Sequence, residues 1–136
     1  MSKLSNFYRT APDGNRNQSF FVNGQWLAET DLSRGELDAV LKKIENICGR
    51  IRIPGDRYAS RTLDLDIICC DGILTDPDEI WSRDYLMICT AELAPDIVFP
   101  GKGPIGDLAG ARIFDKKSIT RLPEFSGEMR GLLNEQ

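Results

Sequence analysis

The most informative gap in the composition is histidine, which does not occur among the 136 residues. Without imidazole, the chain cannot build a Ser-His-Asp or Cys-His catalytic site or a histidine metal site. Long apolar runs and a hydrophobic stretch near the N-terminus are also missing, so the sequence predicts neither a membrane span nor a signal peptide. There is no excess of positive charge, since 17 Lys and Arg stand against 21 Asp and Glu. We therefore expect a cytoplasmic protein that binds neither nucleic acid nor membrane through a basic surface.

The four cysteines have no C-x-x-C spacing, which is the usual signal of a metal or redox motif. Cys69 and Cys70 are adjacent within an apolar run, where small buried thiols are common. The sequence thus predicts four reduced, structural cysteines. With 41% apolar and 28% charged residues, the chain has the ordinary composition of one globular domain.

Two extended segments, residues 3–11 and 20–30, flank a polar, glycine-containing loop, which is typical of two strands joined by that loop. Asn23-Gly24 interrupts the second segment, and we favour a bulge there over a turn. Ser33 and Glu36 fit a capping box, and apolar residues then recur at helical spacing. The sequence therefore predicts a helix from Ser33 that stops at Gly49.

Residues 61–70 alternate apolar and polar residues and then become wholly apolar, as expected of a strand that enters a core. Shorter elements are expected further on: a helix over 85–93, an extended piece over 97–100, a helical turn over 105–109 and a weak helix over 128–133. We divide the chain into a domain over residues 1–117 and a C-terminal tail over 118–136, for which the sequence defines no firm structure.

Two carboxylates lie two residues apart on the predicted strand, at Asp64 and Asp66. Side chains at this spacing leave the same face within about 7 Å of each other, so they can share a hard divalent cation such as Mg²⁺. A solvated strand face shows the same alternation, and that interpretation stays open.

The loop just before this pair carries four arginines: Arg50, Arg52, Arg57 and Arg61. Guanidinium groups bind phosphate oxygens in a bidentate manner, although such a cluster is also found as solvated loop charge. Beside paired carboxylates, the cluster indicates a site for a nucleoside triphosphate.

A pocket for a flat ligand is a third candidate site, formed by Phe21, Asn23, Tyr58 and Tyr85. Aromatic rings there would sandwich a heterocycle while the amide reads its edge. The alternative is that Phe21 and Tyr85 are core residues and that Asn23 belongs to a bulge.

The stretch Arg61-Thr62-Leu63-Asp64-Leu65-Asp66-Ile67 resembles the signature of the 6-hydroxymethyl-7,8-dihydropterin pyrophosphokinase (HPPK) family of folate synthesis. Residues 8–12, 21–23, 44–45, 49–52, 92–100 and 111–116 are similar to further segments of that family. The resemblance implies an α+β, ferredoxin-like (HPPK-like) α/β sandwich. It also implies transfer of pyrophosphate from ATP to 6-hydroxymethyl-7,8-dihydropterin, with release of AMP and with two Mg²⁺ ions.

The same resemblance implies a role for each matching residue. Asp64 and Asp66 would be the metal ligands and, with Arg50 and Arg61, the catalytic residues. ATP would be bound by Glu45, Arg50, Arg52, Arg57, Arg61, Ile67 and Arg83. The pterin would be bound by Thr10, Phe21, Asn23, Tyr58 and Tyr85.

The sequence departs from the family pattern in two respects. The family's first strand and helix are missing, as is its His-Pro segment after the D-x-D strand. The gap in the sheet is expected to stay open, to be closed by direct strand pairing, or to be filled by a homodimer or partner chain. Two functional hypotheses follow: a shortened pyrophosphokinase, which we favour, and a catalytically inactive HPPK-like protein that binds pterin or nucleotide or docks a partner.

Overall fold

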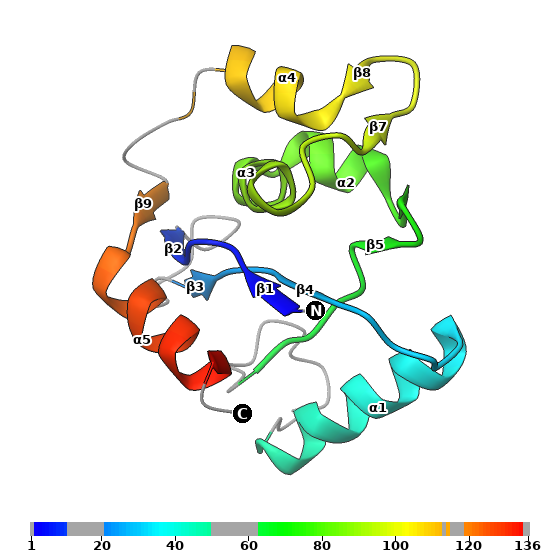
Figure 1. Cartoon of the computed structure of the whole chain (residues 1–136), viewed down its shortest axis with the longest axis vertical. Coiled ribbons are helices and arrows are strands. Elements are labelled where there is room, and N and C mark those ends of the chain that lie inside the picture. Colours follow the sequence, from blue (N-terminus) through cyan, green and yellow to red (C-terminus); the bar gives the residue numbers. More distant parts are fainter. Residues whose placement is uncertain (1, 11–20, 50–62, 113, 115–118, 135–136) are drawn as a thin grey trace, which may run out of the picture. The chain divides into compact units, whose positions relative to one another are not determined.

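The computed structural model describes residues 2–10, 21–49, 63–112, 114 and 119–134 (Figure 1). The helices within these ranges are α1 (Arg34–Ile47), α2 (Pro77–Ser82), α3 (Asp84–Leu93), α4 (Ile105–Ala111) and α5 (Pro123–Asn134). The strands are β1 (Ser2–Leu4), β2 (Tyr8–Thr10), β3 (Phe21–Asn23), β4 (Trp26–Ala28), β5 (Cys69–Cys70), β6 (Ile73–Leu74), β7 (Val98–Phe99), β8 (Gly103–Pro104) and β9 (Ile119–Arg121). In this described part of the chain, no helix is both long and apolar enough to cross a membrane.

The chain divides into two compact units. Unit 1 consists of Met1–Glu29 and Gly72–Gln136, and unit 2 of Thr30–Asp71. The predicted pterin residues of the described ranges therefore belong to unit 1, and the two aspartates of the D-x-D motif belong to unit 2.

An antiparallel hairpin in unit 1 carries a bulge of one residue. In the β2–β3 ladder Tyr8 lies opposite Asn23, and in the β1–β4 ladder Leu4 lies opposite Trp26. Three residues between Leu4 and Tyr8 therefore face only two between Asn23 and Trp26, which is the definition of a bulge. The predicted bulge is confirmed, but its extra residue lies on the N-terminal strand rather than at Asn23-Gly24.

The bulge depends on a glycine and redirects two backbone donors. The ring of Phe7 lies 2.6 Å from the position that a Cβ atom on Gly24 would occupy, so a larger residue does not fit there. The backbone N–H of Asn6 donates to Glu92 Oε1 at 2.8 Å, and that of Phe7 donates to Ser126 Oγ at 2.8 Å. Donors that leave the ladder are thus satisfied by side chains of α3 and α5.

The C-terminal residues 119–134 form a strand and a helix within unit 1. β9 pairs antiparallel with β2, so the sheet order is β3-β2-β9. α5 then packs Phe125 edge-on against Phe7, with ring centroids 5.2 Å apart, and Arg130 Nη2 donates to Asn6 Oδ1 at 3.0 Å. The helix expected over 128–133 is therefore present but begins earlier, at Pro123.

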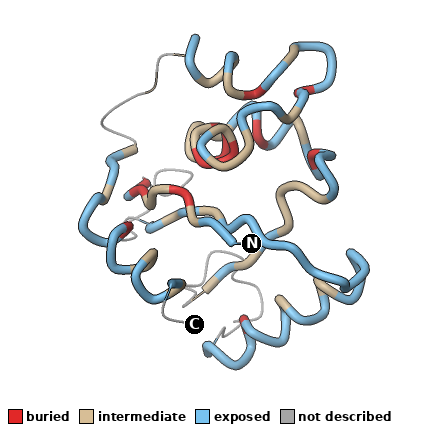
Figure 2. The backbone as a smooth tube through the Cα atoms, viewed as in Figure 1, coloured by how far each residue is buried: buried red, intermediate tan, exposed pale blue. Residues whose placement is uncertain are grey.

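α3 lies on the opposite side of the hairpin from α5 and supplies much of the buried apolar surface (Figures 1 and 2). The buried apolar residues of the described chain are Tyr8, Leu74, Ile80, Leu86, Met87, Cys89, Phe99 and Ile105. α4 packs on α3, and it approaches the segment after α3 closely, since a Cβ atom on Gly106 would lie 2.7 Å from Pro95 Cβ. The helix predicted over 85–93 is confirmed, and the helical turn predicted over 105–109 extends to Ala111.

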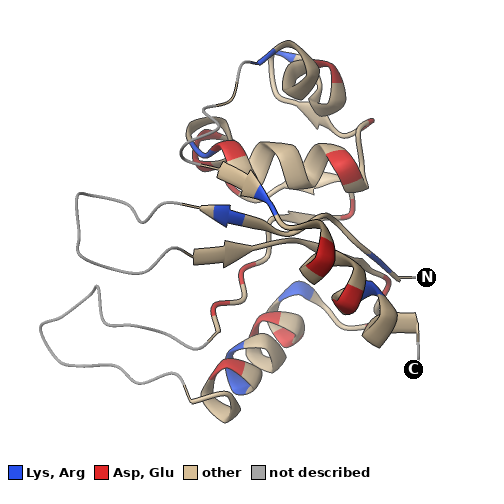
Figure 3. Cartoon of the chain, turned by 90° about the vertical axis from the view of Figure 1, so that its left-hand side faces the viewer, with Lys and Arg blue, Asp and Glu red and all other residues tan. Residues whose placement is uncertain are grey.

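The predicted helix of unit 2 is confirmed as α1 and has the capping box expected from the sequence. Ser33 Oγ accepts the Glu36 N–H at 3.2 Å, and Glu36 Oε1 accepts the Ser33 N–H at 3.2 Å. These bonds from Ser33 hold the pKa of Glu36 below its ordinary value. Acidic and basic residues are interspersed along the helix (Figure 3), which ends before Gly49, where φ is 84°.

The strand predicted over residues 61–70 is wrong in its extent. Only Cys69–Cys70 form a strand, Leu63–Ile68 have no ladder, and residues 61 and 62 lie outside the described ranges. The physical reason is visible at Leu65, whose backbone N–H donates to the Glu45 carboxylate instead of to a neighbouring strand. A turn follows the strand, with positive φ angles at Asp71 (52°) and Gly72 (77°).

Candidate active site

Two of the predicted pterin residues, Thr10 and Asn23, are joined by a hydrogen bond. Asn23 Nδ2 donates to Thr10 Oγ1 at 2.8 Å, and Thr10 is only 5% exposed. Within the described residues, Asn23 Oδ1 accepts no hydrogen bond. The pair therefore presents an amide and a hydroxyl of fixed orientation, which is the kind of group that reads the polar edge of a heterocycle.

Of the predicted aromatic residues, Phe21 lies beside this pair. Phe21 is opposite Thr10 in the ladder, so both side chains leave the same face, and 46% of Phe21 is exposed. This exposure argues against the alternative that Phe21 is a core residue. Tyr85 is half-buried in the first turn of α3, where the next residue, Leu86, accepts a hydrogen bond from Gln25 Nε2 at 3.2 Å. Tyr58 lies outside the described residues.

Several side chains that the sequence analysis did not single out support this face. Glu92 accepts the hydroxyl of Tyr8, and burial, followed by this bond, raises the pKa of Tyr8. Gln25 Nε2 donates to Thr90 Oγ1 at 2.9 Å, so the hairpin is bound to α3 at a second point. Glu92 occurs in a segment that resembles the HPPK family, whereas no sequence signal points to Gln25.

The aspartates of unit 2 lie on one side of an extended segment. Asp64 and Asp66 are exposed, and they alternate with the half-buried residues Leu63, Leu65 and Ile67. Among the described residues, no group of three or more His, Cys, Asp or Glu side chains is arranged to hold a metal ion. Within the described residues, the pair thus offers a cation two carboxylates. Mg²⁺ characteristically binds in this way, through one or two carboxylates and phosphate oxygens.

Glu45 of α1 holds the backbone between the two aspartates. It is 3% exposed, and its Oε2 accepts the Leu65 N–H at 2.6 Å. A buried carboxylate that accepts a backbone N–H fixes the segment to the helix. The structure thus gives Glu45 a positioning contact with the motif, in addition to its predicted place near the nucleotide.

The predicted phosphate-binding residues are only partly within the described ranges. Arg50, Arg52, Arg57 and Arg61 lie outside the described residues. Arg83 lies between α2 and α3, with its Nε 3.6 Å from Glu79 Oε1. Ile67 lies in the segment that carries the aspartates.

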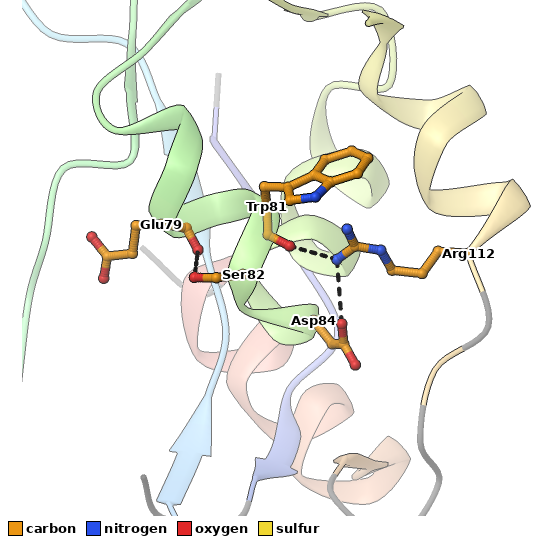
Figure 4. Close-up of polar contacts among 5 residues, drawn as sticks. All are labelled: Glu79, Trp81, Ser82, Asp84 and Arg112. Carbon is orange, nitrogen blue, oxygen red and sulfur yellow. Dashed lines mark hydrogen bonds and ion pairs between the residues drawn. The ribbon is translucent and has the colours of Figure 1, made fainter.

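Arg112 contacts residues on both sides of Arg83, which separates α2 from α3 (Figure 4). Its Nη1 donates to the Trp81 carbonyl at 2.7 Å and pairs with Asp84 Oδ1 at 3.4 Å, so it binds both sides of the junction. Its guanidinium carbon also lies 4.4 Å from the centroid of the Trp81 ring, a cation–π contact. The sequence analysis identified Arg112 only as part of a segment that resembles the family.

Comparisons with known proteins point to one family. The sequence model of 7,8-dihydro-6-hydroxymethylpterin-pyrophosphokinase (HPPK) matches residues 1–95. The 2-amino-4-hydroxy-6-hydroxymethyldihydropteridine pyrophosphokinase of Haemophilus influenzae is 36% identical over 126 residues, covering 88% of this chain and 77% of that protein. The protein of the same name from Pseudomonas aeruginosa is 33% identical over 127 residues, covering 88% and 76%. The mitochondrial folate synthesis bifunctional protein of Pisum sativum is 34% identical over 139 residues, covering 97% of this chain and 24% of that protein.

The chain belongs to the HPPK family. The resemblance seen in the sequence is therefore confirmed, as is the predicted fold class. Helices and antiparallel strands combine in the described residues as expected for the α+β, ferredoxin-like fold of this family.

Proposed function

We propose that this chain transfers pyrophosphate from ATP to 6-hydroxymethyl-7,8-dihydropterin in folate biosynthesis, in a Mg²⁺-dependent reaction that releases AMP. The observation that carries the proposal is the exposed Asp64–Asp66 pair, whose backbone is held to α1 by the buried Glu45. The names of the relatives supply the acceptor and the group transferred.

The donor set of the aspartate pair fits magnesium. Both groups are exposed carboxylates, which hard cations prefer, and Mg²⁺ in proteins commonly completes its coordination with phosphate oxygens and water. We assign two Mg²⁺ ions to Asp64 and Asp66. Bound there, they would neutralise charge on the phosphate chain and orient it.

The pterin is assigned to the face of unit 1 that carries Thr10, Asn23 and Phe21, and we propose Tyr85 and Tyr58 as further residues that bind it. A pterin is flat and has donors and acceptors along one edge, so it suits a hydrogen-bonded amide beside an exposed aromatic ring. The phosphate chain of ATP is assigned to Arg50, Arg52, Arg57, Arg61 and Arg83, with Glu45 and Ile67 near the nucleotide.

The proposed step exchanges one phosphorus–oxygen bond for another. The hydroxymethyl oxygen of the pterin attacks the β-phosphorus, and the bond from that phosphorus to the oxygen bridging the α-phosphate breaks. AMP leaves with the bridging oxygen, and the hydroxyl proton passes to solvent. Such a transfer depends mainly on positioning and charge stabilisation, which is compatible with a chain that has no histidine.

The proposal is tested by measuring AMP release from ATP and Mg²⁺ with and without the pterin, alongside calorimetric titration of each ligand. AMP that forms only when the pterin is present supports the transfer. Binding of both ligands without AMP would show the inactive alternative instead, and absence of binding and turnover would leave a partner-docking role.

A further inference from the structure

Glu92 binds the N-terminal strand of the hairpin through both of its carboxylate oxygens. Oε1 accepts the backbone N–H of Asn6 at 2.8 Å, and Oε2 accepts the hydroxyl of Tyr8. Asn6 lies in the bulge, where its N–H has left the sheet ladder. One side chain of α3 therefore binds both the bulge and the first residue of β2.

This anchor lies next to the Thr10–Asn23 pair. Tyr8 is the cross-strand partner of Asn23 and precedes Thr10 by two residues, so the three side chains share one face of the ladder. Tyr8 is 8% exposed, and this burial raises the pKa of its hydroxyl. A phenol is protonated at neutral pH in any case, so the Tyr8 hydroxyl is a donor to Glu92 there.

We propose that Glu92 is a positioning residue for the pterin, acting through Tyr8 and Asn6 on the hydrogen bond between Thr10 and Asn23. This inference rests on the proposed function, in which Thr10 and Asn23 bind the pterin. Glu92 itself does not contact the ligand in this assignment. It holds β2 against α3 and so keeps the Asn23 amide in one orientation.

Glu92→Gln tests this role with little change in shape. Glutamine retains one carbonyl acceptor but cannot accept hydrogen bonds from both Asn6 and Tyr8. We expect the KM for the pterin to rise about tenfold, as befits loss of a charge-assisted hydrogen bond. The kcat and the KM for ATP should stay within about twofold, because binding of the acceptor alone is weakened. An equal loss for both substrates would overturn the proposal.

Tyr8→Phe removes the hydroxyl and nothing else from this contact. Because both variants break the same hydrogen bond, the double variant should lose less pterin affinity than the product of the two single losses. If the loss of pterin affinity in the double variant equals the product of the two single losses, the proposal is contradicted. Glu128→Gln is the matched control, since Glu128 is also an exposed glutamate of unit 1, and it should behave as the wild type.

A measurement without ligand separates this proposal from the proposed function. The side-chain amide of Asn23 gives its own pair of signals in a ¹⁵N-correlated NMR spectrum, and Glu92→Gln should shift both and accelerate their exchange with water. Unchanged Asn23 signals would overturn the proposal, whatever the pterin does. If the wild type binds no pterin, the proposed function fails, and the Asn23 signals alone decide whether Glu92 orients the amide.

Discussion

The two units hold their candidate functional residues in different ways. In unit 1 the hairpin that carries Thr10 and Asn23 is bound to α3 through Glu92 and Gln25, and to α5 through Ser126. In the described part of unit 2, the buried Glu45 of α1 accepts the Leu65 N–H of the aspartate segment. The contacts described for unit 1 thus come from several elements, whereas the one described for unit 2 involves a buried carboxylate.

This difference indicates where each unit is vulnerable. A distributed set of hydrogen bonds tolerates the loss of one member, since the remaining bonds still position the strand. A buried carboxylate is costly to disturb, because its loss leaves an unpaired backbone donor. We therefore expect substitutions in unit 2 to affect the reaction more strongly than comparable substitutions in unit 1.

The largest effect is expected for Asp66→Asn. Removing one of the two carboxylates should weaken Mg²⁺-dependent ATP binding and lower kcat/KM on the order of a thousandfold, while the melting temperature changes little because Asp66 is exposed. Calorimetric titration of ATP with and without Mg²⁺, together with the AMP assay, measures both effects. Asp31→Asn, an exposed position of the same unit, is the control, and unchanged ATP affinity in Asp66→Asn would remove the metal assignment.

A smaller but still large effect is expected for Glu45→Ala. The Leu65 N–H would lose its acceptor, which costs about 1–3 kcal/mol in the free energy of unfolding, and the aspartate segment would lose its hold on α1. Urea unfolding and the AMP assay should show that stability and activity fall together. Glu45→Gln keeps an acceptor for Leu65 and should recover most of both. If Gln were as damaging as Ala, the charge of Glu45 rather than its bond to Leu65 would matter.

In unit 1, Gly24→Ala should reduce stability with less effect on the reaction. The added methyl group meets the ring of Phe7, and such overpacking typically costs about 1–3 kcal/mol. Gly131→Ala in α5 is the matched control, because no atom lies within 4 Å of its added Cβ atom and alanine is the better helix former. In thermal unfolding, the melting temperature should therefore fall for Gly24→Ala and rise for Gly131→Ala. Equal shifts of the melting temperature would contradict the close approach of Phe7 to Gly24.

The smallest effect at neutral pH is expected from a group whose titration changes stability only at alkaline pH. Burial raises the pKa of the Cys89 thiol from 9.0 to about 12. Between these values the unfolded chain has lost a proton that the folded protein retains, so the free energy of unfolding falls as the pH rises.

Cys89→Ala should flatten this dependence by up to about 1.4 kcal/mol per pH unit between pH 9 and pH 11. Urea unfolding at several pH values measures the slope. Cys48, which is exposed, provides the control: Cys48→Ala should leave the slope unchanged. A slope that is identical in Cys89→Ala and the wild type would show that the thiol does not contribute.

Local signals predicted α1 and α3 well because caps and apolar spacing act within a few residues. The strand over 61–70 was predicted too long. Alternation of apolar and polar residues indicates which side chains are exposed, but it does not show whether another strand pairs with the segment. Here the Leu65 N–H binds Glu45, which lies far away in the sequence. The bulge was predicted on the wrong strand for a related reason, since register depends on both strands. Asn23 was already a candidate from the residues alone and Thr10 was identified from the resemblance. Gln25 was missed because its contacts on α3 are 61 and 65 residues away.

The central claim is that the chain moves the two terminal phosphates of ATP as one unit to the pterin. The most direct test is a ³¹P NMR time course with the purified protein, ATP, Mg²⁺ and 6-hydroxymethyl-7,8-dihydropterin. The account predicts that AMP appears together with a new diphosphate ester, in equal amounts and without ADP. Formation of ADP with inorganic phosphate, or an unchanged spectrum despite binding of both ligands, would contradict it.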